Sequence, residues 1–360
     1  MTQHTNRTGT MDRRTLLHGA VGVVGAATLA GAAPPFGSPS AHARQSVVAT
    51  GNPNTLRTPE RNFEDVADFP YSPRYTTVSV GQEGTGPVRI ASYSAGPRGG
   101  APLLLMHGNP TWSYLYRFMI PAFARRGFRV TAVDLYGFGR SDKPASADIY
   151  TYRAVEEAMT RWFLAQRISD VNLLVQDWGG LIGLRLFARL QARFRRLVTF
   201  NTALPSGAPD EPAPSPTFLQ FEQAAQDPAL LPAPSFAIQP GSTRTIPAAQ
   251  LAAYDAPMPT PDLQTAFRIL PSRVPLDPSQ PGAARNAYIQ DLLARSGRPW
   301  LVTQGADDDI TGGWEGFFQG LAANPATPKP VIIPNAAHFG QEDEGFQLAV
   351  LASKFFAGKI

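Results

Sequence analysis

Short apolar runs alternate with longer amphipathic segments along most of this chain. The apolar runs are continuous rather than alternating, which is typical of strands covered on both faces of a sheet. Because helical segments fall between eight such runs, the pattern predicts an α/β fold with a doubly wound, mostly parallel, eight-stranded sheet. The predicted strands are Thr76–Val80, Val88–Ser94, Leu103–Met106, Val130–Asp134, Val171–Val175, Val198–Asn201, Trp300–Gln304 and Val331–Ile333. The predicted helices are Tyr114–Arg126, Val155–Gln166, Gly180–Arg189, Ala284–Ser296 and Glu344–Phe356.

Two segments break this alternation. Residues 203–283 are rich in proline, and Pro216, Pro247 and Pro261 each suit the first turn of a short helix. We expect this segment to be an inserted helical lid over the carboxyl ends of the strands, where active sites of doubly wound sheets lie. Residues 47–72 should be extended and wrap the domain surface. The apolar residues of this lid are Phe218, Phe221, Phe236, Ile238, Leu263, Phe267 and Leu270. Most of them should pack on the core, and a minority should line a pocket.

The N-terminal segment 1–43 has the composition of a targeting signal rather than of a folded element. It contains the pair Arg13-Arg14, then a moderately apolar stretch, then Ala41-His42-Ala43, which fits an A-x-A cleavage site. This order resembles a twin-arginine export signal and predicts a periplasmic or secreted protein. The apolar stretch is too short and too rich in glycine for stable membrane insertion. An uncleaved tail on a cytoplasmic enzyme is the alternative. With the signal at 1–43 and the lid at 203–283, the core domain comprises residues 44–202 and 284–360.

Composition excludes several kinds of function. The net charge of +4 is dispersed, and no basic run is interleaved with aromatic residues, so we expect no nucleic-acid partner. The absence of cysteine excludes disulfides and a thiol nucleophile. Beyond the N-terminal segment only His107 and His338 remain, which makes a histidine-based metal site improbable. No glycine pattern for cradling phosphate follows a strand, so we predict no cofactor and no metal. The oligomeric state is left open.

The run Val171–Val175 ends abruptly in Gln176-Asp177-Trp178-Gly179-Gly180, and an amphipathic segment follows. A strand, a tight glycine-rich turn and a helix form the nucleophile elbow of an α/β-hydrolase. Serine is the usual residue at the apex, and here the apex is Asp177. A carboxylate at this place attacks carbon and becomes an ester, which water must then cleave. The simpler interpretation is that Asp177 is only the N-cap of the helix.

The histidines support the catalytic interpretation. His107 directly follows a predicted strand and should be structural, whereas His338 lies in a loop after the last strand, where this fold places its base. The fold's order along the chain is nucleophile, acid, histidine. Asp177, an acid within Asp307–Asp309 and His338 reproduce that order.

Three strings of residues closely resemble the haloalkane dehalogenases. They are HGNPTWSYLYR at His107–Arg117, QDWGG at Gln176–Gly180 and DLYGFGRSDKP at Asp134–Pro144. The resemblance extends from about Thr55 to the C-terminus and includes Tyr254-Asp255-Ala256-Pro257 in the lid. The first two strings are specific, and GFGRSDKP is shared with epoxide hydrolases.

The resemblance implies a role for each site residue. Asp177 is the nucleophile that displaces halide from a small apolar haloalkane; the products are a primary alcohol, halide and a proton. The Trp178 indole N–H and the Asn109 amide form a halide clamp, and the backbone N–H groups of these two residues form the oxyanion hole. His338 is the general base. Asp308, an acid three residues before Thr-Gly, orients it, with Asp309 as the second choice.

Family members that place the acid after the preceding strand would have it at Asn201, which cannot carry the charge but can hydrogen-bond near the site.

Three alternatives stay open. An epoxide hydrolase would use the same Asp–His–Asp set with two lid tyrosines, but the lid has only Tyr254, with Tyr288 just beyond it. A fluoroacetate-type dehalogenase needs arginines near the nucleophile, and the elbow has none. A non-catalytic secreted binding protein of the same fold would have a broken triad. An esterase is disfavoured because no serine stands at the apex.

Overall fold

The computed structural model describes residues 48–81, 86–322, 324–325 and 327–360. The predicted export signal, 1–43, lies outside these ranges. The largest element within them is an eight-stranded sheet in the order β11-β10-β9-β8-β5-β6-β4-β3. Its strands are β3 (Arg74–Val80), β4 (Gly86–Ala95), β5 (Ala101–Met106), β6 (Phe128–Val133), β8 (Val171–Gln176), β9 (Phe194–Phe200), β10 (Trp300–Gly305) and β11 (Val331–Ile333).

The predicted doubly wound, mostly parallel sheet is confirmed. All pairs from β6 through β5, β8, β9 and β10 to β11 are parallel. Strand β4 is antiparallel to both of its neighbours, β3 and β6. Every residue of β8 and β10 is buried, as expected for mostly apolar strands that are covered on both faces.

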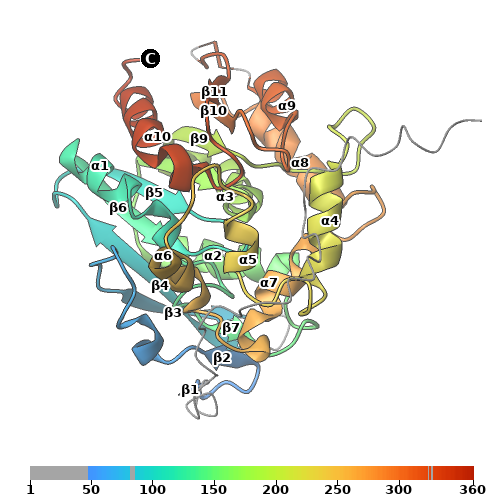
Figure 1. The fold of residues 1–360 in the computed structure, drawn as a ribbon. Helices are drawn as coiled ribbons and strands as arrows, with labels where there is room; N and C mark the ends of the chain where they lie inside the picture. The colour runs from blue at the N-terminus through green and yellow to red at the C-terminus, as the bar shows by residue number, and fades with distance from the viewer. Residues whose placement is uncertain (1–47, 82–85, 323, 326) are drawn as a thin grey trace, which may run out of the picture. The chain divides into compact units, whose positions relative to one another are not determined.

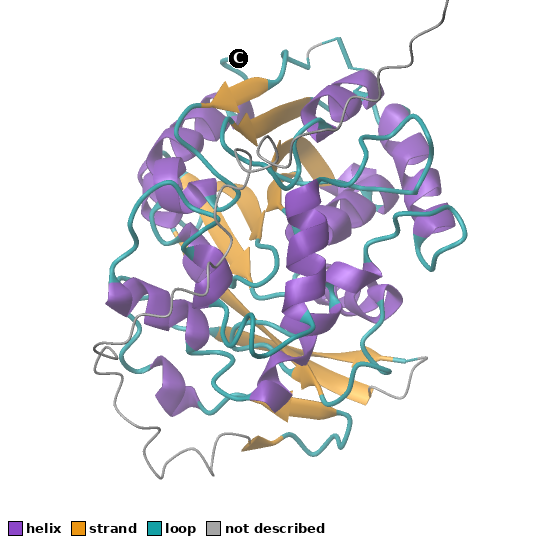
Figure 2. Ribbon diagram, turned by 45° about the vertical axis from the view of Figure 1, so that its right-hand side comes forward, coloured by secondary structure: helices purple, strands orange, loops and turns teal. Residues whose placement is uncertain are grey.

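Helices cover both faces of this sheet (Figure 1, Figure 2). Along β5, Leu103 and Leu105 pack in the cluster that includes α1 and α10, whereas Leu104 and Met106 pack in the cluster of the opposite face. This is the two-residue alternation of a strand. The first layer contains α1 (Met119–Arg125) and α10 (Gly340–Phe356); the second contains α2 (Tyr152–Ala165), α3 (Trp178–Arg189), α8 (Ala283–Ala294) and α9 (Trp314–Leu321).

Two helical segments differ from the expectation. The predicted helix 114–126 is divided into a 3₁₀ turn, η3 (Ser113–Tyr116), and α1. All four η3 residues are buried, and the Tyr116 hydroxyl donates to the Met106 carbonyl, so tertiary contacts hold this turn apart from the helix. Helix α9 was not predicted; it is short and buries Trp314 and Phe318. Another 3₁₀ turn, η4 (Gln191–Arg193), follows α3.

Residues 203–283 form a string of short helices between β9 and α8. Ser215 caps the first of them by accepting a hydrogen bond from the Phe218 N–H. Pro216 and Pro261 occupy first-turn positions, whereas Pro247 is an N-cap residue. The elements are α4 (Pro216–Ala225), α5 (Ser235–Ile238), α6 (Ala248–Asp255), η5 (Pro261–Gln264), α7 (Thr265–Ile269) and η6 (Pro271–Arg273).

A small second sheet occupies part of the segment expected only to be extended. It joins β1 (Val48–Ala49) and β2 (Thr55–Arg57) to β7 (Lys143–Pro144). Along the chain, β2 is followed by a 3₁₀ turn, η2 (Glu60–Phe63). Arg57 donates two hydrogen bonds to the buried Asp142 carboxylate, at 2.7 and 2.9 Å. This pairing fixes the early segment to the loop after β6. Within the described ranges, no helix is both long and apolar enough to cross a membrane.

Candidate active site

Asp177 stands at the apex of a sharp turn between β8 and α3. Its backbone has φ 48° and ψ −125°, which is strained for a residue with a side chain. The turn is tight because glycines line it. A Cβ on Gly179 would lie 2.1 Å from the Met106 carbonyl oxygen, and one on Gly180 would lie 1.9 Å from Thr202 Oγ1. The two glycines therefore let the start of α3 press against neighbouring strand ends and leave the Asp177 side chain protruding.

The Asp177 carboxylate already accepts one backbone hydrogen bond. The Asn109 N–H donates to Asp177 Oδ1 at 2.7 Å. The second predicted oxyanion donor, the Trp178 N–H, makes no hydrogen bond to this carboxylate among the described residues. Asp177 backbone groups are fixed by Asn201, whose carbonyl accepts at 2.9 Å, and by Thr202, whose hydroxyl donates at 2.7 Å.

His338 lies between two carboxylates, although all three residues are far apart in sequence. Its Nδ1 is 3.1 Å from Asp308 Oδ1, and its Nε2 is 3.6 Å from Asp177 Oδ2. The loops after β8, β10 and β11 supply the three side chains at the carboxyl edge of the sheet. Burial lowers the pKa of His338, but Asp308 and Asp177 outweigh it and raise this pKa to about 10.

Of the three consecutive aspartates, Asp308 is the one that reaches His338. Its Oδ1 accepts from the Ile310 N–H at 3.0 Å, and its Oδ2 accepts from Gln304 at 2.9 Å and from the Thr311 hydroxyl. Burial raises the pKa of Asp308, but His338 and these donors bring it below its ordinary value. Asp307 and Asp309 are exposed, and Asp309 accepts from Thr217 in the lid.

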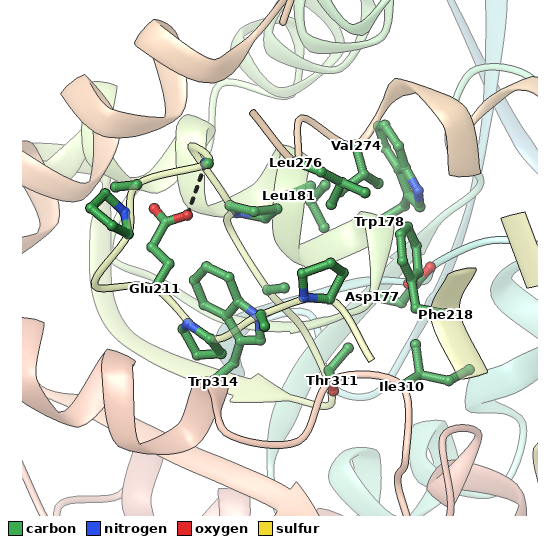
Figure 3. A pocket seen from close by; sticks show the side chains of 18 residues that line it. Asp177, Trp178, Leu181, Glu211, Phe218, Val274, Leu276, Ile310, Thr311 and Trp314 are labelled. Carbon is green, nitrogen blue, oxygen red and sulfur yellow. Dashed lines mark hydrogen bonds between the residues drawn. The ribbon is translucent and has the colours of Figure 1, made fainter. Parts of the chain in front are cut away.

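The two predicted halide-clamp residues differ in how freely their N–H groups are available. Among the described residues, no acceptor bonds to the Trp178 indole N–H, and this side chain lines a cavity next to Asp177 (Figure 3). Asn109 is buried; its Nδ2 donates to the Phe267 carbonyl of the lid at 3.2 Å, while its Oδ1 has no partner. One Asn109 amide hydrogen is thus already used to attach the lid.

The cavity beside Asp177 has a volume of about 230 Å³. Of the lid residues considered from the sequence, Phe218 lines it; Ile238, Leu263, Phe267 and Leu270 are buried elsewhere, Phe221 is half-buried against the core and Phe236 is 55% exposed. The proline-rich segment 203–214 supplies most of one wall instead. The lining residues are Asp177, Trp178, Leu181, Ala203, Pro205, Gly207, Ala208, Pro209, Glu211, Pro212, Ala213, Pro214, Phe218, Val274, Leu276, Ile310, Thr311 and Trp314.

Comparison with known proteins identifies the family of this chain. A family model described as alpha/beta hydrolase fold matches residues 101–345. Haloalkane dehalogenase 1 of Mycobacterium tuberculosis is 40% identical over 297 residues, which cover 82% of this chain and 96% of that protein. A haloalkane dehalogenase of Psychrobacter cryohalolentis is 35% identical over 83% of this chain and 97% of its own length. The chain belongs to the haloalkane dehalogenase family.

A solved structure of a haloalkane dehalogenase from Paraglaciecola agarilytica superimposes with a TM-score of 0.73 at 27% identity. The superposition covers 82% of this chain and 97% of the Paraglaciecola agarilytica chain. This member of the haloalkane dehalogenase family therefore has the family's fold over almost its whole described length. Among the described residues, no cluster of side chains could hold a metal ion.

Of the two amides that contact the His338 residue in this dehalogenase fold, sequence reasoning missed Gln176 and expected Asn201 to hydrogen-bond near the site. Gln176 Nε2 lies 3.3 Å from both the His338 carbonyl and His338 Nε2, and Gln176 Oε1 is buried without a partner. Asn201 donates to the carbonyls of Ala337 and His338 at 2.7 and 3.1 Å and accepts from the Gly305 N–H. The position of Gln176 directly before the apex was the available signal. His107 is structural, as predicted: Nδ1 contacts the Gly108 carbonyl and Nε2 accepts from the Leu135 N–H.

Proposed function

We propose that the chain hydrolyses the carbon–halogen bond of haloalkanes through a covalent ester on Asp177. The observation that carries this proposal is the buried His338 between the apex carboxylate and Asp308, beside an apolar cavity into which an indole N–H is free to donate. A carboxylate nucleophile, a base and a donor for the leaving halide are the groups that this reaction needs.

In the first step, an Asp177 carboxylate oxygen forms a bond to the carbon that carries the halogen, and that carbon releases halide with the bonding electrons. Oδ1 is held by the Asn109 N–H, so Oδ2 is the oxygen free to attack and Oδ1 becomes the ester carbonyl. Trp178 and Asn109 stabilise the departing halide by donating hydrogen bonds in a site where burial strengthens them.

In the second step, water attacks the ester carbonyl and His338 takes its proton. With both carboxylates charged, the pKa of about 10 keeps His338 protonated at neutral pH. Ester formation neutralises Asp177, which lowers the His338 pKa and releases that proton. The neutral ring then accepts a proton from water and returns it to the departing alcohol oxygen. Asp177 is regenerated as its acid, which gives its proton back to His338.

The geometry argues against an epoxide hydrolase. That reaction needs lid tyrosines that can protonate the epoxide oxygen. The Tyr254 hydroxyl is fully buried and donates to Glu342, and Tyr288 is 51% exposed on α8. Neither lines the cavity that contains Asp177. The described lining also contains no lysine or arginine that could bind the carboxylate of a fluoroacetate-type substrate.

Halide release from a panel of bromo- and chloroalkanes tests the proposal. We expect bromide release by the wild-type chain, none by Asp177→Asn, and a stable ester in His338→Phe, seen as a mass increase equal to the alkyl group. Diol formation from styrene oxide without halide release would overturn the assignment. An unmodified His338→Phe chain that still binds substrate would remove the ester mechanism.

A further inference from the structure

The cavity that contains Asp177 has a second carboxylate in its wall. Glu211 lies at the opposite end of the lining from Trp178 and Asp177 in Figure 3. Apart from these two acids, the described lining residues are apolar, with Trp178, Trp314 and Thr311 as the polar exceptions. A carboxylate in a mostly apolar wall is costly unless hydrogen bonds stabilise its charge.

Four donors hold the Glu211 carboxylate in place. The Ser206 N–H and hydroxyl donate to it at 2.8 and 2.6 Å, and the Gly207 N–H donates at 3.0 Å, the bond drawn in Figure 3. Gln290 of α8 donates at 2.5 Å and also bonds to the Leu204 carbonyl. These contacts fix the direction of the carboxylate relative to the core.

The surrounding chain is built to stay rigid. Pro205, Pro209, Pro212 and Pro214 restrict the backbone around Glu211. Gly207 has φ 75°, and a Cβ there would lie 2.5 Å from the Asp277 backbone, so only glycine lets this wall close against the segment that follows η6. A preorganised group recognises a ligand at a lower entropic cost than a mobile one.

All four donors to Glu211 are neutral, and no arginine or lysine among the described residues pairs with it. Within the described part of the chain, the Glu211 carboxylate in this wall therefore has no cationic side chain paired with it. We infer that Glu211 forms a cation-binding subsite for substrates with an ammonium group at the end remote from the halogen. This inference rests on the proposed dehalogenation and names a substrate class for it. A substrate with a carboxylate at that end is disfavoured, because like charges repel.

Bromide release from three matched series tests the subsite. Each series increases in chain length: ω-bromoalkyl trimethylammonium ions, their uncharged tert-butyl isosteres, and ω-bromocarboxylates. For the wild-type chain we expect kcat/KM for the cation to exceed that for the isostere by about tenfold or more at the best-matched length. The carboxylates should be the poorest substrates. Glu211→Gln should bring the cation-to-isostere ratio close to one.

The ratio is the decisive readout, because a general disturbance of the loop lowers turnover of both substrates. Asp210→Asn is the matched control: it removes the same charge from the neighbouring residue, which is exposed and does not line the cavity. It should leave the ratio unchanged. A ratio near one at every chain length in the wild type, or a ratio unaffected by Glu211→Gln, overturns the subsite.

Binding of halogen-free alkyltrimethylammonium ions, measured by calorimetry, separates this inference from the proposed reaction. We expect Glu211→Gln to weaken binding about tenfold and Asp210→Asn to leave it unchanged, in the wild-type and Asp177→Asn backgrounds alike. If binding follows this pattern while no variant releases bromide, the proposed reaction fails and the subsite stands. If bromide is released without any preference for the cation, the proposed reaction stands and the subsite fails.

Discussion

Replacing Asp177 by asparagine should lower the pKa of His338. The change leaves the side chain the same size and removes its charge, so Asp177→Asn imitates the neutral ester that we propose as the intermediate. In the wild-type site, Asp308 faces one ring nitrogen at 3.1 Å and Asp177 faces the other at 3.6 Å. Burial opposes the imidazolium, yet the two carboxylates raise the pKa to about 10 from an ordinary value near 6.5.

The separation of 3.6 Å sets the size of the effect. Two unit charges at this distance attract by about 4 to 5 kcal/mol at an effective dielectric constant near 20. That energy corresponds to roughly three pKa units and is an upper limit, because the asparagine amide still offers a dipole to the ring. We expect a fall of about one to two units, with Asp308 keeping the remainder of the elevation.

Titration of ¹³C- and ¹⁵N-labelled histidine by NMR measures this pKa, and loss of one signal in His338→Phe assigns it. The control is Asp309→Asn, which removes an exposed carboxylate next to Asp308 and should leave the His338 pKa unchanged. A wild-type His338 that titrates near its ordinary value would refute the reasoning. So would a pKa that is identical in the wild-type and Asp177→Asn chains, since the proton release assigned to ester formation depends on that difference.

Two further outcomes follow from single contacts. Trp178→Phe should slow halide release by about 10²-fold, as expected for one lost donor to developing charge, whereas Trp314→Phe, on another side of the same cavity in Figure 3, should change it little; equal rates for the two variants would exclude Trp178 from the clamp. Thr311→Val removes a donor to Asp308 with little change of shape. In rapid-quench kinetics it should slow ester hydrolysis by about tenfold and leave ester formation nearly unchanged. An unaffected hydrolysis rate would mean that Gln304 and backbone N–H groups suffice to orient Asp308.

The sheet was predictable because its strands are buried on both faces. Burial on both faces favours apolar residues, and four of the five residues of Val171–Val175 in β8 are apolar, so this strand can be recognised from the sequence alone. The apex was predictable for a different reason: a Cβ on either glycine after Asp177 would lie within about 2.1 Å of a residue at a neighbouring strand end, so the turn requires glycine at both positions. Once the strand ends were located, the order of Asp177, Asp308 and His338 along the chain followed the fold.

The lid was harder to predict from the sequence, because its apolar residues do not recur with a regular period. Four of the seven apolar lid residues considered are fully buried, yet only Phe218 reaches the cavity. Prolines and Glu211 make the wall, and nothing in their spacing marks them as facing Asp177. The amides of Gln176 and Asn109 show the same limit. Their roles depend on which carbonyl or ring each one meets, and those partners come from other elements.

The position of the acid follows from the contacts of Asn201. Its amide donates to two carbonyls in the His338 loop and accepts from the Gly305 N–H, so it connects β9, β10 and the loop after β11. An aspartate there could not donate, and its charge would face the two carbonyl oxygens. The charge is instead supplied by Asp308, whose own donors come from β10 and from the loop after it. Asn201 therefore holds the loop that contains His338, and Asp308 carries the charge that faces the His338 ring. Neither residue can replace the other in this site.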